Sequence, residues 1–166
     1  MSLALAALAA VAAALLQASV VPYITIGDAA PDLVLVVVLL WASFGALDGA
    51  MVAAFVGGIA VDALLARPMG SSSFVLLLAA GATTLVARTG ARSRVPLLIL
   101  AAFALSAATA LLWFVVYGAL AGPVPAPDPV GSVIPDAIYT TVVYSAALPI
   151  AILLRRRFGE QERVAW

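Results

Sequence analysis

Six long apolar runs divide this chain and limit its fold more than any other feature. They cover roughly residues 3–22, 31–46, 47–66, 71–88, 95–120 and 133–154. A run of about 20 apolar residues can cross the ~30 Å hydrocarbon core of a bilayer as one helix. In lipid the backbone groups must be satisfied within the segment, so helices are the expected elements. The pattern predicts an all-α, polytopic membrane protein with six transmembrane helices in a single membrane domain, residues 1–166.

The second and third runs need a break between them. One helix over residues 31–66 would be ~54 Å long at ~1.5 Å per residue, too long for one crossing. The stretch Gly45-Ala46-Leu47-Asp48-Gly49 is the predicted break. Both halves are short, so we expect the second helix to tilt little or to begin below the headgroups.

Composition excludes several classes of function. The chain is 66% hydrophobic and 10% charged, whereas soluble domains are roughly 45–50% apolar and 25% charged. The formal net charge is zero, so no overall field favours nucleic acid. Cys and His are absent, which removes thiol chemistry, His acid–base catalysis and the common transition-metal ligand sets. No nucleotide-binding or hydrolase motif is present. We therefore expect no enzyme activity, no metal, no cofactor and no nucleic-acid partner.

Arginine predicts the orientation, because positive residues accumulate on the cytoplasmic side. If the N- and C-termini are both cytoplasmic, seven arginines lie inside and only Arg67 lies outside. The first run could instead be a signal peptide. It lacks the basic start that such a peptide needs, and further spans follow it. We therefore expect it to be the first membrane helix.

The first run has one face of small residues and one face of bulky residues. The small face contains Ala6, Ala10, Ala13 and Gln17. The bulky face, which suits contact with lipid, contains Leu5, Leu8, Val11 and Leu15. Small residues let helix backbones approach closely. We therefore expect Gln17 to point into the bundle, with snorkelling to the interface as the alternative.

The third run also divides into two faces at helical spacing. One face is a small-residue ridge, formed by Gly49, Ala53, Gly57 and Ala60. The opposite side is expected to hold Asp48, Met51, Phe55, Gly58 and Asp62. A ridge of this kind packs helices together, either within one chain or between a chain and its partner. We expect packing within the chain, with a homodimer as the alternative.

Asp62 lies inside the third run and needs an explanation. An Asp at the bilayer centre costs ~2.5–3.5 kcal/mol on insertion scales, and less near an interface. Arg67 is a poor partner along the helix, because five residues turn it ~140° away, although it could fold back over the helix end. Asp62 is therefore a structural hydrogen-bond acceptor, a partner contact or a ligand site. For the structural role, the candidate donors on other spans are Gln17, Ser19, Tyr139 and Thr140.

Asp48 does not form a catalytic pair with Asp62. The two carboxylates are 14 residues apart, or ~21 Å along a helix. Carboxylates that share chemistry lie within ~10 Å of each other. We expect Asp48 to be a helix cap or a solvated acid at the turn.

The order of motifs in the first half resembles that of a known family. Leu16-Gln17 lies near the end of the first run, and Pro31-Asp32-Leu33 opens the second. The third run is rich in glycine from Gly49 to Gly58, and Asp62 is followed by Pro68-Met69-Gly70. This order, with six spans and inside termini, resembles MreD, the rod shape-determining membrane protein family of bacteria. The last three runs match the family in layout only, with Tyr144 and Pro149 in the sixth.

The resemblance implies a location, a process and partners. The location is the bacterial cytoplasmic (inner) membrane, which the chain would cross several times. The process is cell elongation, in which the family acts without catalysis and helps to organise peptidoglycan synthesis. The implied partners are an MreC-like protein with one membrane span and, through it, the MreB filament and the elongation peptidoglycan synthases. The implied fold is similar to the substrate-binding subunits of energy-coupling-factor vitamin transporters.

The residues that carry the resemblance are Gln17, Pro31, Asp32, Gly58, Asp62, Pro68 and Gly70. The family gives them no catalytic role, so the resemblance implies structural roles or partner contacts. Gly49 and Gly57 of the small-residue ridge, and Arg67 at the helix end, are further candidates of the same kind. The ridge is also the expected docking surface for the helix of an MreC-like partner.

Two other functions stay open. A solute-binding membrane subunit of a vitamin-type transporter would have an outward cavity near Gln17, Asp62, Tyr139 and Tyr144. The hydroxyl groups of the sixth run would then line a pocket rather than hold helices together. An intramembrane enzyme would have to rely on Asp62 without His, Cys or Lys, which is the least favoured alternative.

Overall fold

The computed structural model describes residues 3–26, 29–44, 47–88, 94–121 and 129–159, which form six α-helices and one short 3₁₀ helix. The elements are α1 (Leu3–Ser19), η1 (Val21–Tyr23), α2 (Leu33–Ser43), α3 (Leu47–Leu64), α4 (Ser71–Arg88), α5 (Arg94–Ala121) and α6 (Pro129–Gly159). The described part contains no β-strand element, so the all-α prediction is confirmed. The predicted break between α2 and α3 falls partly on residues 45–46, which lie outside the described ranges.

Five of these helices are long and apolar enough to cross a membrane. The exception is α2, which has 11 residues and is therefore about 16 Å long. The prediction of six full spans is thus confirmed for five helices, while the second is shorter than the expected 31–46. The helix begins only after Asp32, whose carboxylate accepts a hydrogen bond from the Leu35 amide, and it ends at Ser43.

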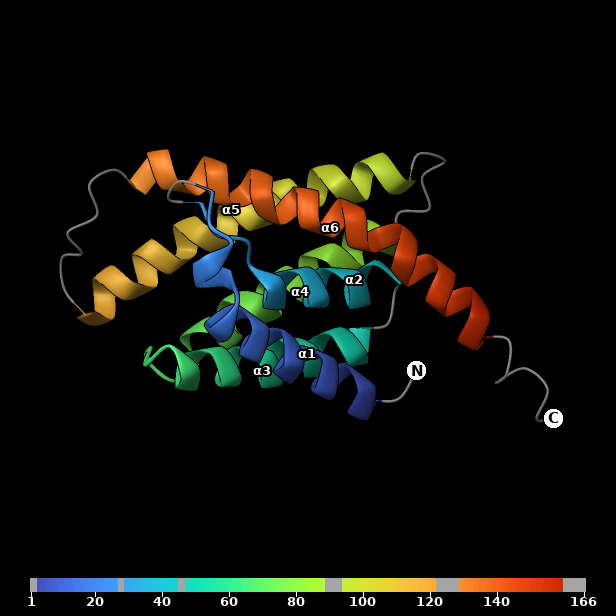
Figure 1. Cartoon of the computed structure of the whole chain (residues 1–166), viewed down its shortest axis with the longest axis horizontal. Helices are drawn as coiled ribbons and strands as arrows, with labels where there is room; N and C mark the ends of the chain where they lie inside the picture. The colour runs from blue at the N-terminus through green and yellow to red at the C-terminus, as the bar shows by residue number, and fades with distance from the viewer. Residues whose placement is uncertain (1–2, 27–28, 45–46, 89–93, 122–128, 160–166) are drawn as a thin grey trace.

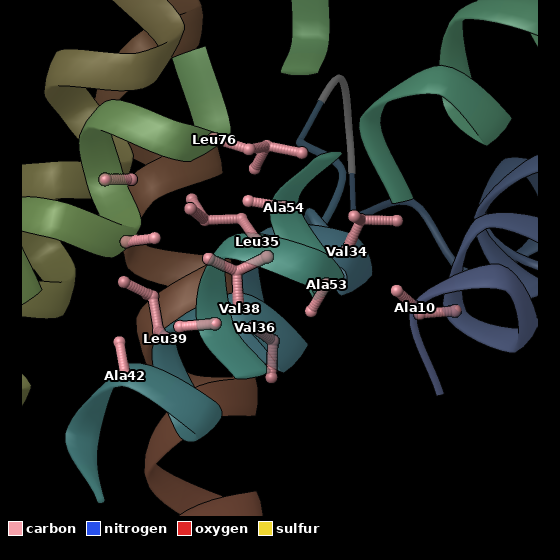
Figure 2. Close-up of a cluster of buried hydrophobic side chains, with 14 of the residues drawn as sticks. Ala10, Val34, Leu35, Val36, Val38, Leu39, Ala42, Ala53, Ala54 and Leu76 are labelled. Atoms are coloured by element: carbon pink, nitrogen blue, oxygen red, sulfur yellow. The ribbon is translucent and has the colours of Figure 1, made fainter. Parts of the chain in front are cut away.

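The short helix α2 lies in the middle of the bundle. It contacts every other α-helix. Figure 2 shows Val34 on the side of Ala10 from α1, and Leu35 on the side of Leu76 from α4. A helix that is apolar on all sides suits such a position, because no face has to meet water. Its fully buried side chains are Val34, Leu35, Val38, Leu39 and Ala42.

Successive helices run in opposite directions along the bundle (Figure 1). The left end in that view is called the cap end: α1, α3 and α5 end there, and α2, α4 and α6 begin there. The start of α1 and the end of α6 both lie toward the opposite end.

The two faces of α1 follow the predicted pattern. Its small residues Ala6, Ala10 and Ala13 are buried. Its bulky residues Leu5, Leu8 and Leu15 are exposed, and Leu8 has 68% of its surface accessible. The helix therefore packs its alanine face against the bundle, most closely against α3.

The predicted small-residue ridge of α3 is largely buried, and the opposite side is buried in part. A methyl group added to Gly57 of the ridge would lie 2.7 Å from Val34 and 3.1 Å from Ala10. The ridge therefore packs within the chain, and most of it is closed to a partner or a second copy. On the opposite side, Met51 and Phe55 are exposed, whereas Gly58 and Asp62 are buried against α4. Because α3 has neighbours on two sides, it buries more than one face.

Gly58 is a point of close approach between α3 and α4. A Cβ atom at this position would overlap the backbone nitrogen and Cα of Ser73. The Ser73 hydroxyl also donates to the carbonyl of Phe55 at 3.0 Å. Gly58 precedes Asp62 by four residues, so the two lie on the same face of the helix. The missing side chain at Gly58 lets the Asp62 carboxylate reach the first turn of α4.

We predict that Gly58→Ala destabilises the bundle, because the backbone of Ser73 cannot move aside as a flexible side chain can. Overpacking of this kind costs about 1–3 kcal/mol, which should lower the midpoint of thermal unfolding in mild detergent. Gly81→Ala is the matched control, because a methyl group added there meets nothing within 4 Å. This control should be neutral or should stabilise by up to about 1 kcal/mol. Equal midpoints for the two variants would contradict the close contact.

Candidate functional site

The carboxylate of Asp62 caps the start of α4. One of its oxygens accepts a hydrogen bond from the Gly70 amide at 2.7 Å. The Ser72 amide lies 3.3 Å from each oxygen, and the Ser71 hydroxyl lies 3.4 Å from one of them. The first amides of a helix have no partner within the helix, and they carry its positive dipole end. A negative group is favourable there, so these amides stabilise the Asp62 carboxylate although only 1% of the residue's surface is exposed.

The turn between α3 and α4 brings these amides back to Asp62. Ala66 has a left-handed backbone with φ 51°, and the Arg67 amide donates to the Asp62 carbonyl at 2.9 Å. This is the bond pattern that commonly ends a helix. Gly70 has φ +90°, which a residue with a side chain adopts only with strain. The Pro68 carbonyl accepts from both the amide and the hydroxyl of Ser71.

The donors to Asp62 correct one expectation from the sequence. They come from the α3–α4 turn and the first residues of α4, and not from the expected candidates Gln17, Ser19, Tyr139 and Thr140. Each of those four side chains bonds elsewhere. Ser19 donates to the carbonyl of Leu15 within its own helix, and Tyr139 donates to the carbonyl of Ile24.

Gln17 and Asp32 together satisfy the start of α2. The side-chain oxygen of Gln17 accepts from the Val34 amide at 3.1 Å, and one Asp32 oxygen accepts from the Leu35 amide at 2.9 Å. The Gln17 side chain is also a hydrogen-bond partner of the Asp32 carboxylate. Because a carboxylate only accepts, the Gln17 amide group is the donor. Gln17 therefore points into the bundle, as its face predicted.

Helix α6 joins this network through two side chains. The Ala30 amide donates to a carboxylate oxygen of Asp136 at 2.8 Å, and the Asp32 amide donates to the Thr140 hydroxyl at 3.1 Å. Deeper in the bundle, the Tyr144 hydroxyl lies 2.7 Å from the Ser43 hydroxyl of α2. Several α6 hydroxyls thus hold helices together, and Thr140 also lines the cavity between them.

A polar cavity of about 370 Å³ lies between these helices, at the cap end. Its charged and polar lining consists of Gln17, Asp32, Arg67, Ser72, Ser106, Thr109, Asp136 and Thr140. Its apolar lining includes Val21, Val34, Val61, Leu65, Val75 and Leu76. Pockets for small molecules are commonly about 300–1,000 Å³ and combine apolar walls with a few convergent polar groups. This cavity is the candidate site.

The cavity contains some of the residues selected from the sequence and not others. Gln17, Pro31, Asp32 and Arg67 line it. The candidates outside its lining are Gly49, Gly57, Gly58, Asp62, Pro68 and Gly70. Of the four residues expected around a solute cavity, only Gln17 takes part, and Asp62, Tyr139 and Tyr144 do not. Gly49 instead packs against the side chain of Trp41, which occupies the space beside it.

Four polar residues of the described lining were not selected as cavity residues from the sequence: Ser72, Ser106, Thr109 and Asp136. Each lies on a helix whose periodicity indicates only which side is buried. Which neighbouring helix ends face that side depends on the packing of all six helices. The one available signal in the sequence was the position of Asp136, seven residues after the start of α6. Ionisable groups within spans are rare and face the bundle interior or water, so this Asp could have been predicted to line a cavity. Among the described residues, no group of acids has the arrangement of a metal site.

Replacing Asp62 tests its capping role. We predict that Asp62→Leu lowers the midpoint of thermal unfolding strongly, because the Gly70 and Ser72 amides lose their acceptor at about 1–3 kcal/mol each. Asp62→Asn keeps one acceptor oxygen and should have an intermediate effect. Asp48→Asn is the control, because Asp48 lies exposed in the first turn of α3, where a charge contributes about 0.3–1 kcal/mol. An Asp62→Leu protein as stable as this control would refute the capping role.

Comparisons with known proteins do not identify the chain. No family model matches it. No curated protein and no solved structure matches it either. What the chain does is therefore inferred from its own residues, chiefly the capped helix starts and the polar cavity beside them.

Proposed function

We propose that this chain is a non-enzymatic membrane component of the bacterial cell-elongation machinery, of the MreD kind. It would help to organise peptidoglycan synthesis through an MreC-like partner with one membrane span. One observation supports the proposal most. The polar residues that carry the family resemblance act together as helix caps and turn residues at one end of a helical membrane bundle.

These contacts explain why such residues would recur in a scaffold. Gln17 and Asp32 satisfy the start of α2, and Asp62 satisfies the start of α4. Gly58 allows the close approach of α3 to α4, and Gly70 provides the turn. A membrane scaffold needs a bundle with fixed helix ends and needs no catalytic group. The motif residues supply the first of these requirements.

The partner surface has to differ from the small-residue ridge. Gly49, Ala53 and Gly57 are buried within the chain, so most of the ridge cannot receive a partner helix. Exposed apolar side chains on α1 and α3 remain, among them Leu8, Met51 and Phe55. A single helix of an MreC-like protein could pack on such a face in place of lipid. A homodimer would likewise need an exposed face.

The test is co-purification with the MreC-like protein of the same bacterium, in mild detergent and in a lipid nanodisc. We predict that the tagged chain retains this partner in both. The control is the same partner with its membrane helix replaced by an unrelated apolar helix, which should be lost. Absence of the natural partner in both preparations would remove the support for a scaffold. A position of the gene beside genes for MreB and MreC would place the chain in the same process.

The solute-binding alternative keeps one observation in its favour, the cavity of about 370 Å³ at the cap end. A vitamin-transporter subunit would also need a surface for the coupling helices of its energising partner. Mass spectrometry of the purified protein should then detect a tightly held vitamin. Its absence, together with capture of the MreC-like partner, would favour the scaffold.

A further inference from the structure

We propose that the cavity at the cap end binds a small organic cation that carries N–H groups, such as a primary ammonium or guanidinium compound. The proposal goes beyond the scaffold function and does not depend on it. It rests on three observations: the charges that line the cavity, a buried hydroxyl without a partner, and the residue types of the wall.

Among the described residues, one basic and two acidic side chains line the cavity. Arg67 and Asp32 attract each other electrostatically, and Asp32 is further occupied by the Leu35 amide and by Gln17. Asp136 is less occupied. A carboxylate can accept about four hydrogen bonds, and among the described residues only Ala30 donates to it. The described part of the lining therefore has an excess of one negative charge, at Asp136, which a cationic ligand would balance.

Ser72 supplies the second, independent observation. It lines the cavity and has 4% of its surface exposed. Its hydroxyl oxygen is the one buried side-chain oxygen without a hydrogen-bond partner in the described part of the chain. Leaving a buried hydroxyl unpaired costs about 1–3 kcal/mol, so such groups call for an explanation. The oxygen itself has almost no accessible surface, so rotation of the Ser72 side chain toward the cavity would bring the hydroxyl to a ligand and remove the cost.

The wall of the cavity selects among cations. Among the residues whose side chains the structure describes, none that lines the cavity is aromatic, whereas quaternary ammonium groups are usually held over aromatic faces. The acceptors here are carboxylate, amide and hydroxyl oxygens, which bond to N–H groups. The valines and leucines of the lining suit a short apolar body attached to the charged group. The volume of about 370 Å³ suits a small molecule.

Aminohexanol is a suitable probe, because it combines a primary ammonium, a short apolar chain and a hydroxyl group. Hexanediol has the same chain without the charge, and the trimethylated form of aminohexanol keeps the charge without N–H groups. Binding would be measured by isothermal titration calorimetry of the full chain in mild detergent. We expect aminohexanol to bind at least tenfold more tightly than either analogue. Equal binding of the three, or binding of none, would overturn the proposal.

Two variants test the residues without disturbing the fold. Asp136→Asn removes the negative charge but keeps an oxygen for the Ala30 amide. Ser72→Ala removes a hydroxyl that has no partner in the described part of the chain. Both should unfold at the wild-type temperature. We expect Asp136→Asn to weaken aminohexanol binding at least tenfold and Ser72→Ala to weaken it several-fold, with Asp48→Asn unchanged. Wild-type affinity in Asp136→Asn would contradict the assignment.

The ammonium group could come from a free solute or from the headgroup of an aminophospholipid. Nanodiscs of phosphatidylcholine, with and without phosphatidylethanolamine, distinguish these sources. If the headgroup is the ligand, phosphatidylethanolamine should compete with aminohexanol, and the competition should disappear in Asp136→Asn. If the ligand is a free solute, aminohexanol should bind equally in both discs. Either result supports a site for N–H cations, whereas loss of binding in both discs would overturn it.

Discussion

Two helices of this bundle begin among buried side chains, and the amides of their first turns need acceptors that lipid does not provide. For α4 the acceptor is the Asp62 carboxylate, and for α2 the acceptors are Gln17 and Asp32. Two of these three side chains belong to helices other than the one that they cap. Capping therefore ties α1 to α2 and α3 to α4 at one end of the bundle. It also allows α2 to start inside the protein, which is why an 11-residue helix can be the central one.

The same end of the bundle holds the cavity, and the two features share residues. Gln17 and Asp32 belong to both, because they accept hydrogen bonds from the first amides of α2 and also line the cavity. Asp62 belongs to the caps alone, while Asp136 and Ser72 face the cavity from α6 and α4. Polar groups inside a membrane bundle are costly unless they are paired. The capping side chains are paired with helix amides, whereas the Asp136 carboxylate accepts from one described donor and has room for more. A scaffold role and a ligand site are therefore compatible in one small domain.

The fold class, the approximate spans and the faces of α1 were predictable, because they depend on local properties of the chain. Run length indicates a crossing, and the spacing of Ala6, Ala10 and Ala13 indicates the buried side. The prediction failed where the packing of particular neighbours mattered. Donors to Asp62 were expected at Gln17, Ser19, Tyr139 and Thr140, yet they come from the α3–α4 turn and the start of α4, which covers Gly58 and Asp62. Hydrophobic periodicity separates two faces of a helix. It does not predict how much of each face is buried when the helix packs against several neighbours.

The sequence by itself determined that this chain forms apolar helices, where most of them begin and end, and that Asp62 cannot pair with Asp48 in catalysis. These conclusions need only helix geometry and the cost of polar groups in lipid. Only the tertiary structure decided which donors Asp62 accepts from, which residues line the cavity, and that the small-residue ridge is largely occupied within the chain. The physical reason is that these contacts join segments far apart in the chain, such as Asp32 and Thr140, which are 108 residues apart. Their distance depends on the packing of the whole bundle.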